Sequence, residues 1–142
     1  MIKAIQTKYK GYIFRSRLEA RWAVFFDELG VKYEYETEGY DLGELGWYLP
    51  DFYLLEEKWF VEVKGSLDED ISGVEKVRCL DNHCPGEAMG CLIFRDLEYA
   101  EFKCDDDGPD FNGAYLRAQM IMPILSLQKF NKAINKARQA RF

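Results

Sequence analysis

The stretch LPDFYLLEEKWFVEVKGS (residues 49–66) has three ionisable residues among apolar neighbours, apart from the charged run EEK in its middle. They are Asp51, Glu62 and Lys64. Two carboxylates and one amine can form an internal salt-bridge cluster. The same three groups can also bind a divalent cation and act on a phosphodiester bond, provided that the fold brings them to one place.

The stretch predicts a β-hairpin that would bring the two carboxylates together. If residues 47–55 and 58–64 are antiparallel strands around a short symmetric loop, residues whose numbers sum to 113 lie opposite each other. Asp51 then faces Glu62 on the same side of the sheet, with Cβ atoms about 5 Å apart. Period-two alternation places Lys64 on that side too.

Like charges at this separation repel, so such a pair favours a bound proton or a bound cation. Mg²⁺ takes hard oxygen ligands and usually binds one or two carboxylates together with a substrate phosphate. A lysine beside that ion can hold a water molecule or stabilise developing charge, as phosphodiester hydrolysis requires. The internal salt-bridge cluster remains the alternative.

The surrounding sequence predicts the elements that would position this hairpin. SRLEARWAVFFDELG after Gly11 reads as a helix that ends at Gly30 and has one apolar face, formed by Leu18, Trp22, Phe25 and Leu29. VKYEYETE reads as a half-buried strand before the hairpin. A helix is expected over residues 68–80 although Gly73 interrupts it, followed by a buried strand over residues 88–95. A second apolar face, Ile124, Leu127, Ile134 and Ala137, predicts a basic tail helix that starts at Pro123.

Composition bounds the classes of protein that the chain can belong to. Its 142 residues, 48% of them hydrophobic, predict one domain. The order of the expected elements predicts a mixed α/β fold, in which helices cover a sheet. The absence of a membrane-spanning run and of a secretory signal favours a cytoplasmic protein without a membrane partner. The four cysteines are expected to be reduced thiols.

Charge is distributed unevenly along the chain, whose net charge is −6. Residues 1–21 carry six basic residues against one acid, and residues 114–142 carry six basic residues and no acid. Two basic ends around an acidic middle can form a positive rim beside a negative pocket, which is compatible with nucleic-acid binding. Solvated helix faces explain either end equally well.

Pro50-Asp51 followed after ten residues by Glu62-Val63-Lys64 resembles the PD-(D/E)XK nuclease superfamily, which includes many restriction endonucleases and the archaeal-type Holliday junction resolvases. The family core is a helix, three strands, a helix and a strand, the order expected above. The resemblance spans roughly residues 8–95. Over this range the sequence is similar to small stand-alone nucleases of this superfamily, which are often carried by phages and mobile elements.

The resemblance implies a Mg²⁺- or Mn²⁺-dependent DNA nuclease with a restriction-endonuclease-like core over about residues 8–104 and a basic helical extension over residues 114–142. By resemblance, Asp51, Glu62 and the backbone carbonyl of Val63 would bind the metal ion, and Lys64 would position or activate water. Glu19 in FRSRLEARW would hold a second ion or orient a metal-bound water.

Glu19 also has a purely structural interpretation. Ser16 and Glu19 form a capping box, in which the serine caps a helix and the glutamate reaches back to its backbone. Basic residues near this helix start and on the tail helix are candidates for phosphate contacts or are ordinary solvated residues. They are Lys10, Arg15, Arg17, Arg21, Lys132, Lys136 and Arg138. The tail helix could equally serve a homodimer interface, since resolvases and many restriction enzymes act as dimers.

Other functions compete with the nuclease. The first is a catalytically inactive module that binds DNA or a protein, and another is an inhibitor whose acidic middle mimics DNA. A zinc site is a further alternative, but no CxxC pair supports it. Its candidate ligands are Cys79, His83, Cys84, Cys91 and Cys104. Tyr33, Tyr35, Tyr48 and Tyr53 could stack on bases or simply cover the sheet.

Overall fold

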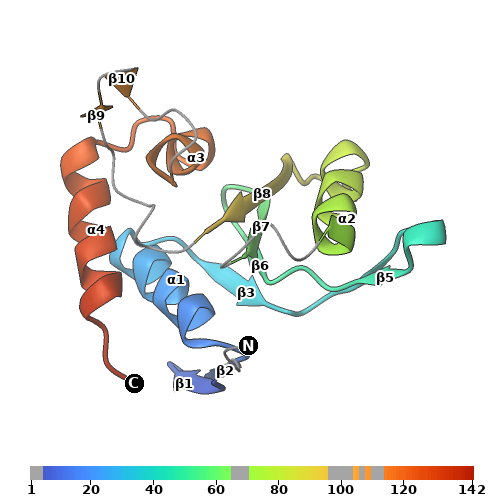
Figure 1. Ribbon diagram of the computed structural model, residues 1–142, viewed down its shortest axis with the longest axis horizontal. Coiled ribbons are helices and arrows are strands. Elements are labelled where there is room, and N and C mark those ends of the chain that lie inside the picture. Colours follow the sequence, from blue (N-terminus) through green and yellow to red (C-terminus); the bar gives the residue numbers. More distant parts are fainter. Residues whose placement is uncertain (1–4, 65–70, 96–103, 106–107, 110–113) are drawn as a thin grey trace. The chain divides into compact units, whose positions relative to one another are not determined.

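The computed structural model describes residues 5–64, 71–95, 104–105, 108–109 and 114–142 (Figure 1). The chain forms two compact units. The terminal unit comprises Met1–Val31 and Leu97–Phe142, and the central unit comprises Lys32–Asp96. Helices and strands occur in both, so the expected mixed α/β class is confirmed. None of the helices in the described part is both long and apolar enough to span a bilayer.

The central unit is built on a four-stranded mixed sheet with the order β3-β6-β7-β8. Its strands are β3 (Tyr33–Tyr35), β6 (Phe52–Leu54), β7 (Trp59–Val63) and β8 (Gly90–Phe94). The first three are antiparallel, whereas β8 runs parallel to β7. A parallel neighbour requires a crossover connection, and the segment between them contains α2 (Ile71–Asn82).

The β6–β7 hairpin has the predicted register. Phe52 pairs with Val61 and Leu54 with Trp59, so the paired numbers sum to 113 as expected. The four-residue turn is closed by the Lys58 N–H, which donates to the Leu54 carbonyl over 2.8 Å. The register between β6 and β7 therefore determines which of their side chains share a face of the sheet.

The expected strand over residues 47–55 is instead two strands in two sheets. Its first part is β5 (Trp47–Tyr48), which pairs with β4 (Tyr40–Asp41) rather than with β7. A short 3₁₀ helix (Gly43–Leu45) connects β4 and β5. Pro50 separates β5 from β6, and its missing N–H explains why one continuous strand does not form.

Helix α2 covers one face of the central sheet. Its Val77 and Leu80 are buried in a cluster with Phe60 of β7 and Cys91 of β8. Of the helix expected over residues 68–80, residues 68–70 lie outside the described part, and the observed helix extends two residues further to Asn82. The cluster supplies the apolar burial that holds the sheet and helix together.

Gly90 at the start of β8 allows the side chains of Asp81 in α2 and Trp59 in β7 to approach the β8 backbone closely. A Cβ atom there would lie 2.6 Å from Asp81 Oδ1 and 2.6 Å from the Trp59 ring. The same Asp81 oxygen accepts a hydrogen bond from the Cys91 N–H over 2.9 Å. Overpacking at this point should force the strand away from α2.

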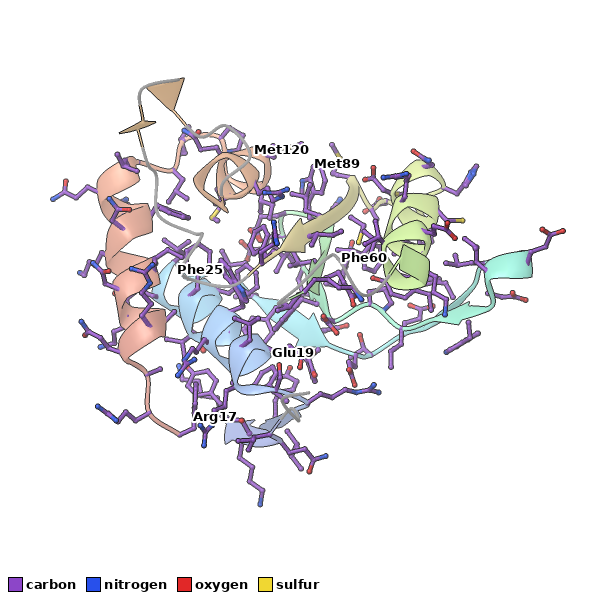
Figure 2. All side chains as sticks on the ribbon, viewed as in Figure 1. Arg17, Glu19, Phe25, Phe60, Met89 and Met120 are labelled. Carbon is purple, nitrogen blue, oxygen red and sulfur yellow. The ribbon has the colours of Figure 1, made fainter. Side chains whose placement is uncertain are left out.

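We therefore expect Gly90→Ala to lower the free energy of unfolding by about 1–3 kcal/mol, measured by urea denaturation. Met89→Ala is the matched control, because Met89 is the preceding residue and is 65% exposed (Figure 2). A Gly90→Ala variant as stable as the control would show that the strand and α2 do not approach this closely.

The terminal unit begins with a hairpin of β1 (Thr7–Tyr9) and β2 (Tyr12–Phe14). The two residues of its turn, Lys10 and Gly11, both have positive φ, 46° and 85°. Two-residue turns with positive φ at both positions match the right-handed twist of the strands that they connect. Local sequence patterns do not predict these strands, because each contains only three residues.

Helix α1 (Arg17–Glu28) follows and confirms the first predicted helix. Ser16 caps its N-terminus, and Gly30, with a φ of 72°, lies just beyond its end. Trp22 and Phe25 of the predicted apolar face are fully buried. Helix α1 thus combines a serine cap, an apolar face and a terminal glycine, as the sequence indicated.

The tail helix α4 (Leu127–Gln139) packs on α1 within the terminal unit, where the Phe25 and Phe130 rings lie 5.6 Å apart. It starts at Leu127 and not at Pro123, since the Ser126 hydroxyl caps it by accepting from the Lys129 N–H. The buried face also differs from the prediction, because Ile124 is 99% exposed and Leu127 is exposed. Its buried residues are Phe130, Ala133, Ile134 and Ala137.

Three further elements complete the described terminal unit. They are α3 (Ala114–Ile121), β9 (Cys104–Asp105) and β10 (Gly108–Pro109). β9 and β10 pair with each other as an antiparallel ladder.

Candidate functional site

The β6–β7 hairpin carries two buried carboxylates, one just before β6 and one near the end of β7. Asp51 immediately precedes β6, and continuing the observed register by one residue would place it opposite Glu62 of β7. Only 7% of Asp51 and 8% of Glu62 is exposed to solvent. Burying a carboxylate is unfavourable unless hydrogen bonds, a cation or a proton compensate. The contacts of these two carboxylates therefore decide which chemistry the site can support.

Backbone and side-chain contacts hold the predicted residues at this point. The Val63 N–H donates to Asp51 Oδ2 over 2.8 Å, which ties the first carboxylate to the end of β7. Lys64 Nζ lies 3.8 Å from Glu62 Oε1. The Lys64 N–H donates to the Phe94 carbonyl of β8 over 2.9 Å. The structure therefore brings Asp51, Glu62, Val63 and Lys64 into one site at the end of β7.

Tyr48 is a member of this site that the sequence analysis assigned only to base stacking or to cover of the sheet. Its hydroxyl donates to Glu62 Oε2 over 2.5 Å. Tyr48 is buried in β5, and burial, with the nearby Cys91 and Glu62, raises the pKa of Tyr48 far above its usual value. The hydroxyl therefore stays protonated and orients the Glu62 carboxylate. Because β5 belongs to another sheet, no strand pattern predicts this contact.

The tyrosine contacts predict how stability depends on alkaline pH. Burial also raises the pKa of Tyr9 above its usual value, and the pKa of Tyr40 to about 12. The unfolded chain releases these protons at about pH 10, whereas the folded chain retains them. The tyrosine contribution should therefore be fully present below pH 10 and be lost as the pH rises from there.

We expect the free energy of unfolding to fall above about pH 10, measured by urea denaturation at closely spaced pH values. Tyr48→Phe should fall less steeply with pH than the wild-type protein, because it lacks one raised pKa. Met89→Ala, which removes no titratable group from an exposed position, is the control, and its slope should match that of the wild type. Equal slopes for Tyr48→Phe and the wild type would contradict the buried hydrogen bond.

Glu36 is a third acid near this site, and the sequence did not predict it. It follows β3 directly, and its N–H donates to the Asp51 carbonyl over 2.9 Å. The Glu36 carboxylate lies within 4.8 Å of the Asp51 carboxylate. The Glu36 backbone has a positive φ of 49°. No sequence spacing reveals this neighbour, because it depends on the pairing of β3 with β6. The Glu62 carboxylate lies outside this 4.8 Å group.

Glu19, labelled in Figure 2, lies in the first turn of α1 in the terminal unit. Ser16 Oγ accepts from the Glu19 N–H over 3.1 Å and donates to Glu19 Oε2 over 2.7 Å. Ser16 therefore caps the helix as the capping box predicts. The Glu19 carboxylate accepts from the serine hydroxyl, whereas the capping box predicted a contact with the Ser16 backbone. Its role toward a metal ion stays a prediction.

The predicted phosphate-binding residues all belong to the terminal unit. Lys10 is exposed in the β1–β2 turn and pairs with Asp27 over 3.6 Å. Arg15 and Arg17 flank the α1 cap and are exposed, whereas Arg21 is half-buried. On α4, Lys132 and Lys136 are exposed and Arg138 is half-buried. Their contact with DNA remains a prediction.

The predicted zinc ligands do not form a cluster in the described part of the chain. Cys79, Cys84 and Cys91 are free thiols there. Among the described residues, no group of three potential ligands within reach of one ion contains a cysteine or His83. The Cys84 thiol instead donates to the Asp81 carbonyl over 3.3 Å, and the Cys104 side chain lies outside the described set.

The donor set of the Asp51 site is chemically suited to Mg²⁺ or Mn²⁺. It offers carboxylates and backbone carbonyls, the hard oxygen ligands that these ions prefer, with no thiol or imidazole required. The approach of Glu36 to Asp51 lets one ion contact both carboxylates. Comparisons with protein-family models, curated proteins and solved structures give no match to this chain. The functional argument therefore depends on the geometry of these residues.

Proposed function

We propose that this protein is a Mg²⁺- or Mn²⁺-dependent nuclease that hydrolyses phosphodiester bonds in DNA, on a core of the restriction-endonuclease type. The observation that carries the proposal is the β6–β7 hairpin. Asp51 Oδ2 accepts from the Val63 N–H at the end of β7 over 2.8 Å, and Lys64 Nζ lies 3.8 Å from Glu62 Oε1. Two buried acids beside an amine are the groups that such hydrolysis requires.

Asp51 and Glu62 would hold the metal ion, with Glu36 and the Val63 carbonyl as further oxygen donors. When bound, the ion supplies Lewis-acid stabilisation of the phosphate and lowers the pKa of water. The Val63 N–H fixes Asp51, and the Tyr48 hydroxyl fixes Glu62, so neither carboxylate has to be ordered when substrate arrives.

Lys64 has the chemical role of a positioned cation. Its side chain is 15% exposed, and its backbone is held by β8, so the ammonium group is limited to a small region near Glu62. There it can donate to an attacking water or to a phosphate oxygen whose negative charge increases in the transition state. The basic residues of the terminal unit would supply contacts to the DNA backbone, and a second copy of the chain is a further proposed partner.

A cleavage assay tests the function directly. Single-stranded, duplex, flapped and four-way DNA are incubated with the full chain and Mg²⁺, Mn²⁺ or EDTA. The proposal expects cutting of at least one substrate with either ion and none with EDTA. A preparation of Lys64→Met, purified in the same way, controls for contaminating nucleases and should be inactive. Absence of cutting on every substrate would overturn the proposal.

One observation favours a second candidate, an inactive DNA- or protein-binding module. Both oxygens of Glu62 have a partner, because Tyr48 contacts Oε2 and Lys64 lies near Oε1. Such a network can serve structure alone. Salt-sensitive DNA binding without metal-dependent cutting would identify this candidate.

A further inference from the structure

A cavity of about 380 Å³ lies in the central unit, beside the sheet. Residues of β3, β6 and β7 line it, as do the segments that follow β3 and precede β8. This volume is in the range of sites that hold small organic ligands. It greatly exceeds the space that a single metal ion occupies, and neither Asp51 nor Glu62 is a lining residue, although Glu36 is.

Three aromatic rings among the lining residues contact one another. Phe60, labelled in Figure 2, lies centrally in this group. Its ring centroid is 4.7 Å from that of Tyr53 and 5.6 Å from that of Tyr40. The Tyr40 and Phe60 rings are nearly perpendicular, at 82°. Rings inclined to one another in this way present both faces and edges to a ligand, and the faces of aromatic rings attract cations.

The charged residues that line the same cavity are all acidic. They are Glu34, Glu36, Glu38 and Glu87, and the lining set contains no lysine or arginine. Lys58 pairs with Glu87 over 2.7 Å from outside the lining set, and Thr37 donates to Glu34 over 3.0 Å. An anion such as a phosphate would be repelled here, whereas an ammonium group would be attracted.

We propose that this cavity binds an organic cation that carries primary ammonium or guanidinium groups. The rings of Tyr40, Tyr53 and Phe60 would contact the apolar part and the charged head, and the glutamates would accept its N–H hydrogen bonds. A free polyamine and a lysine or arginine side chain of a partner share this chemistry. The inference shares Glu36 with the proposed metal site but uses neither Asp51 nor Glu62, and the variants below therefore leave Glu36 unchanged.

Isothermal titration of the full chain with spermidine, with a short lysine-rich peptide and with Mg²⁺ alone tests the inference. Saturable binding of spermidine or of the peptide, with shifts of the Tyr40 and Tyr53 ring resonances in NMR spectra, supports it. Tighter binding of spermidine assigns a free polyamine, and tighter binding of the peptide assigns a partner's side chain. Binding of both that leaves the Tyr40 and Tyr53 ring resonances unshifted would overturn it, because an acidic patch without ring contacts behaves in that way.

Two variants test the cavity itself. Tyr53→Leu should weaken binding about fivefold through the loss of one ring. Glu38→Gln, an exposed position that leaves packing intact, should weaken it at least about twofold. The controls are Trp47→Leu and Glu75→Gln, which remove a ring and a charge of the central unit outside the lining set. Unchanged affinity in Glu38→Gln and in a folded Tyr53→Leu would overturn the assignment, as would controls that weaken binding equally.

Discussion

Glu62→Gln should lower the rate of metal-dependent DNA cleavage at least about 100-fold, because the loss of one charged ligand or transition-state contact commonly has an effect of this size. Glutamine has nearly the same shape as glutamate and can still accept from the Tyr48 hydroxyl, which contacts Oε2. What disappears is the negative charge that would bind the cation and pair with Lys64. Initial rates on the best-cut substrate, at fixed Mn²⁺, give the effect.

The matched control is Glu75→Gln, which removes the same charge from an exposed position on α2. Its rate should stay within about twofold of the wild type, since exposed charges are strongly screened. Unfolding curves for both variants separate lost chemistry from lost structure. Undiminished cleavage in a folded Glu62→Gln variant would exclude Glu62 as a metal ligand.

Phe25→Ala should lower the free energy of unfolding by about 3–5 kcal/mol, the usual cost of removing a buried aromatic ring. Phe25 is fully buried in α1, and its ring lies 5.1 Å from that of Trp22 and 5.6 Å from that of Phe130. Since small domains are stable by only about 5–15 kcal/mol, the variant should approach spontaneous unfolding. Urea denaturation followed by tryptophan fluorescence measures the loss.

Ile124→Ala is the control for that experiment. Ile124 is 99% exposed, so its truncation should change the free energy of unfolding by less than about 0.5 kcal/mol. A Phe25→Ala variant that loses less than 1 kcal/mol would contradict the packing of α4 on α1, because that ring is shared between the two helices.

The sequence predicted the parts of the fold that local patterns determine. Helix α1 carries a serine cap, an apolar face and a terminal glycine, and all three are local signals. The β6–β7 register followed from alternation and loop length, and it predicted that Asp51 would lie beside Glu62. Where several local rules agree, the structure agrees with them.

Prediction failed where pairing between distant segments decides the structure. Tyr48 reaches Glu62 from a strand that belongs to another sheet, and Glu36 reaches Asp51 because β3 pairs with β6. Neither contact has a sequence signature. The tail helix began later than expected because the capping bond of Ser126 prevailed over the preference of Pro123 for a first turn.

A titration with Mn²⁺, followed by backbone amide resonances, tests most directly whether the hairpin holds a divalent ion. The paramagnetic ion broadens the resonances of nearby nuclei. Because the Val63 N–H is bonded to Asp51, the Val63 and Lys64 signals should broaden first, well below one equivalent of Mn²⁺. In an Asp51→Asn/Glu62→Gln variant, these two signals should stay sharp. Broadening confined to other residues, or Val63 and Lys64 signals that broaden equally in the variant, would contradict the metal site.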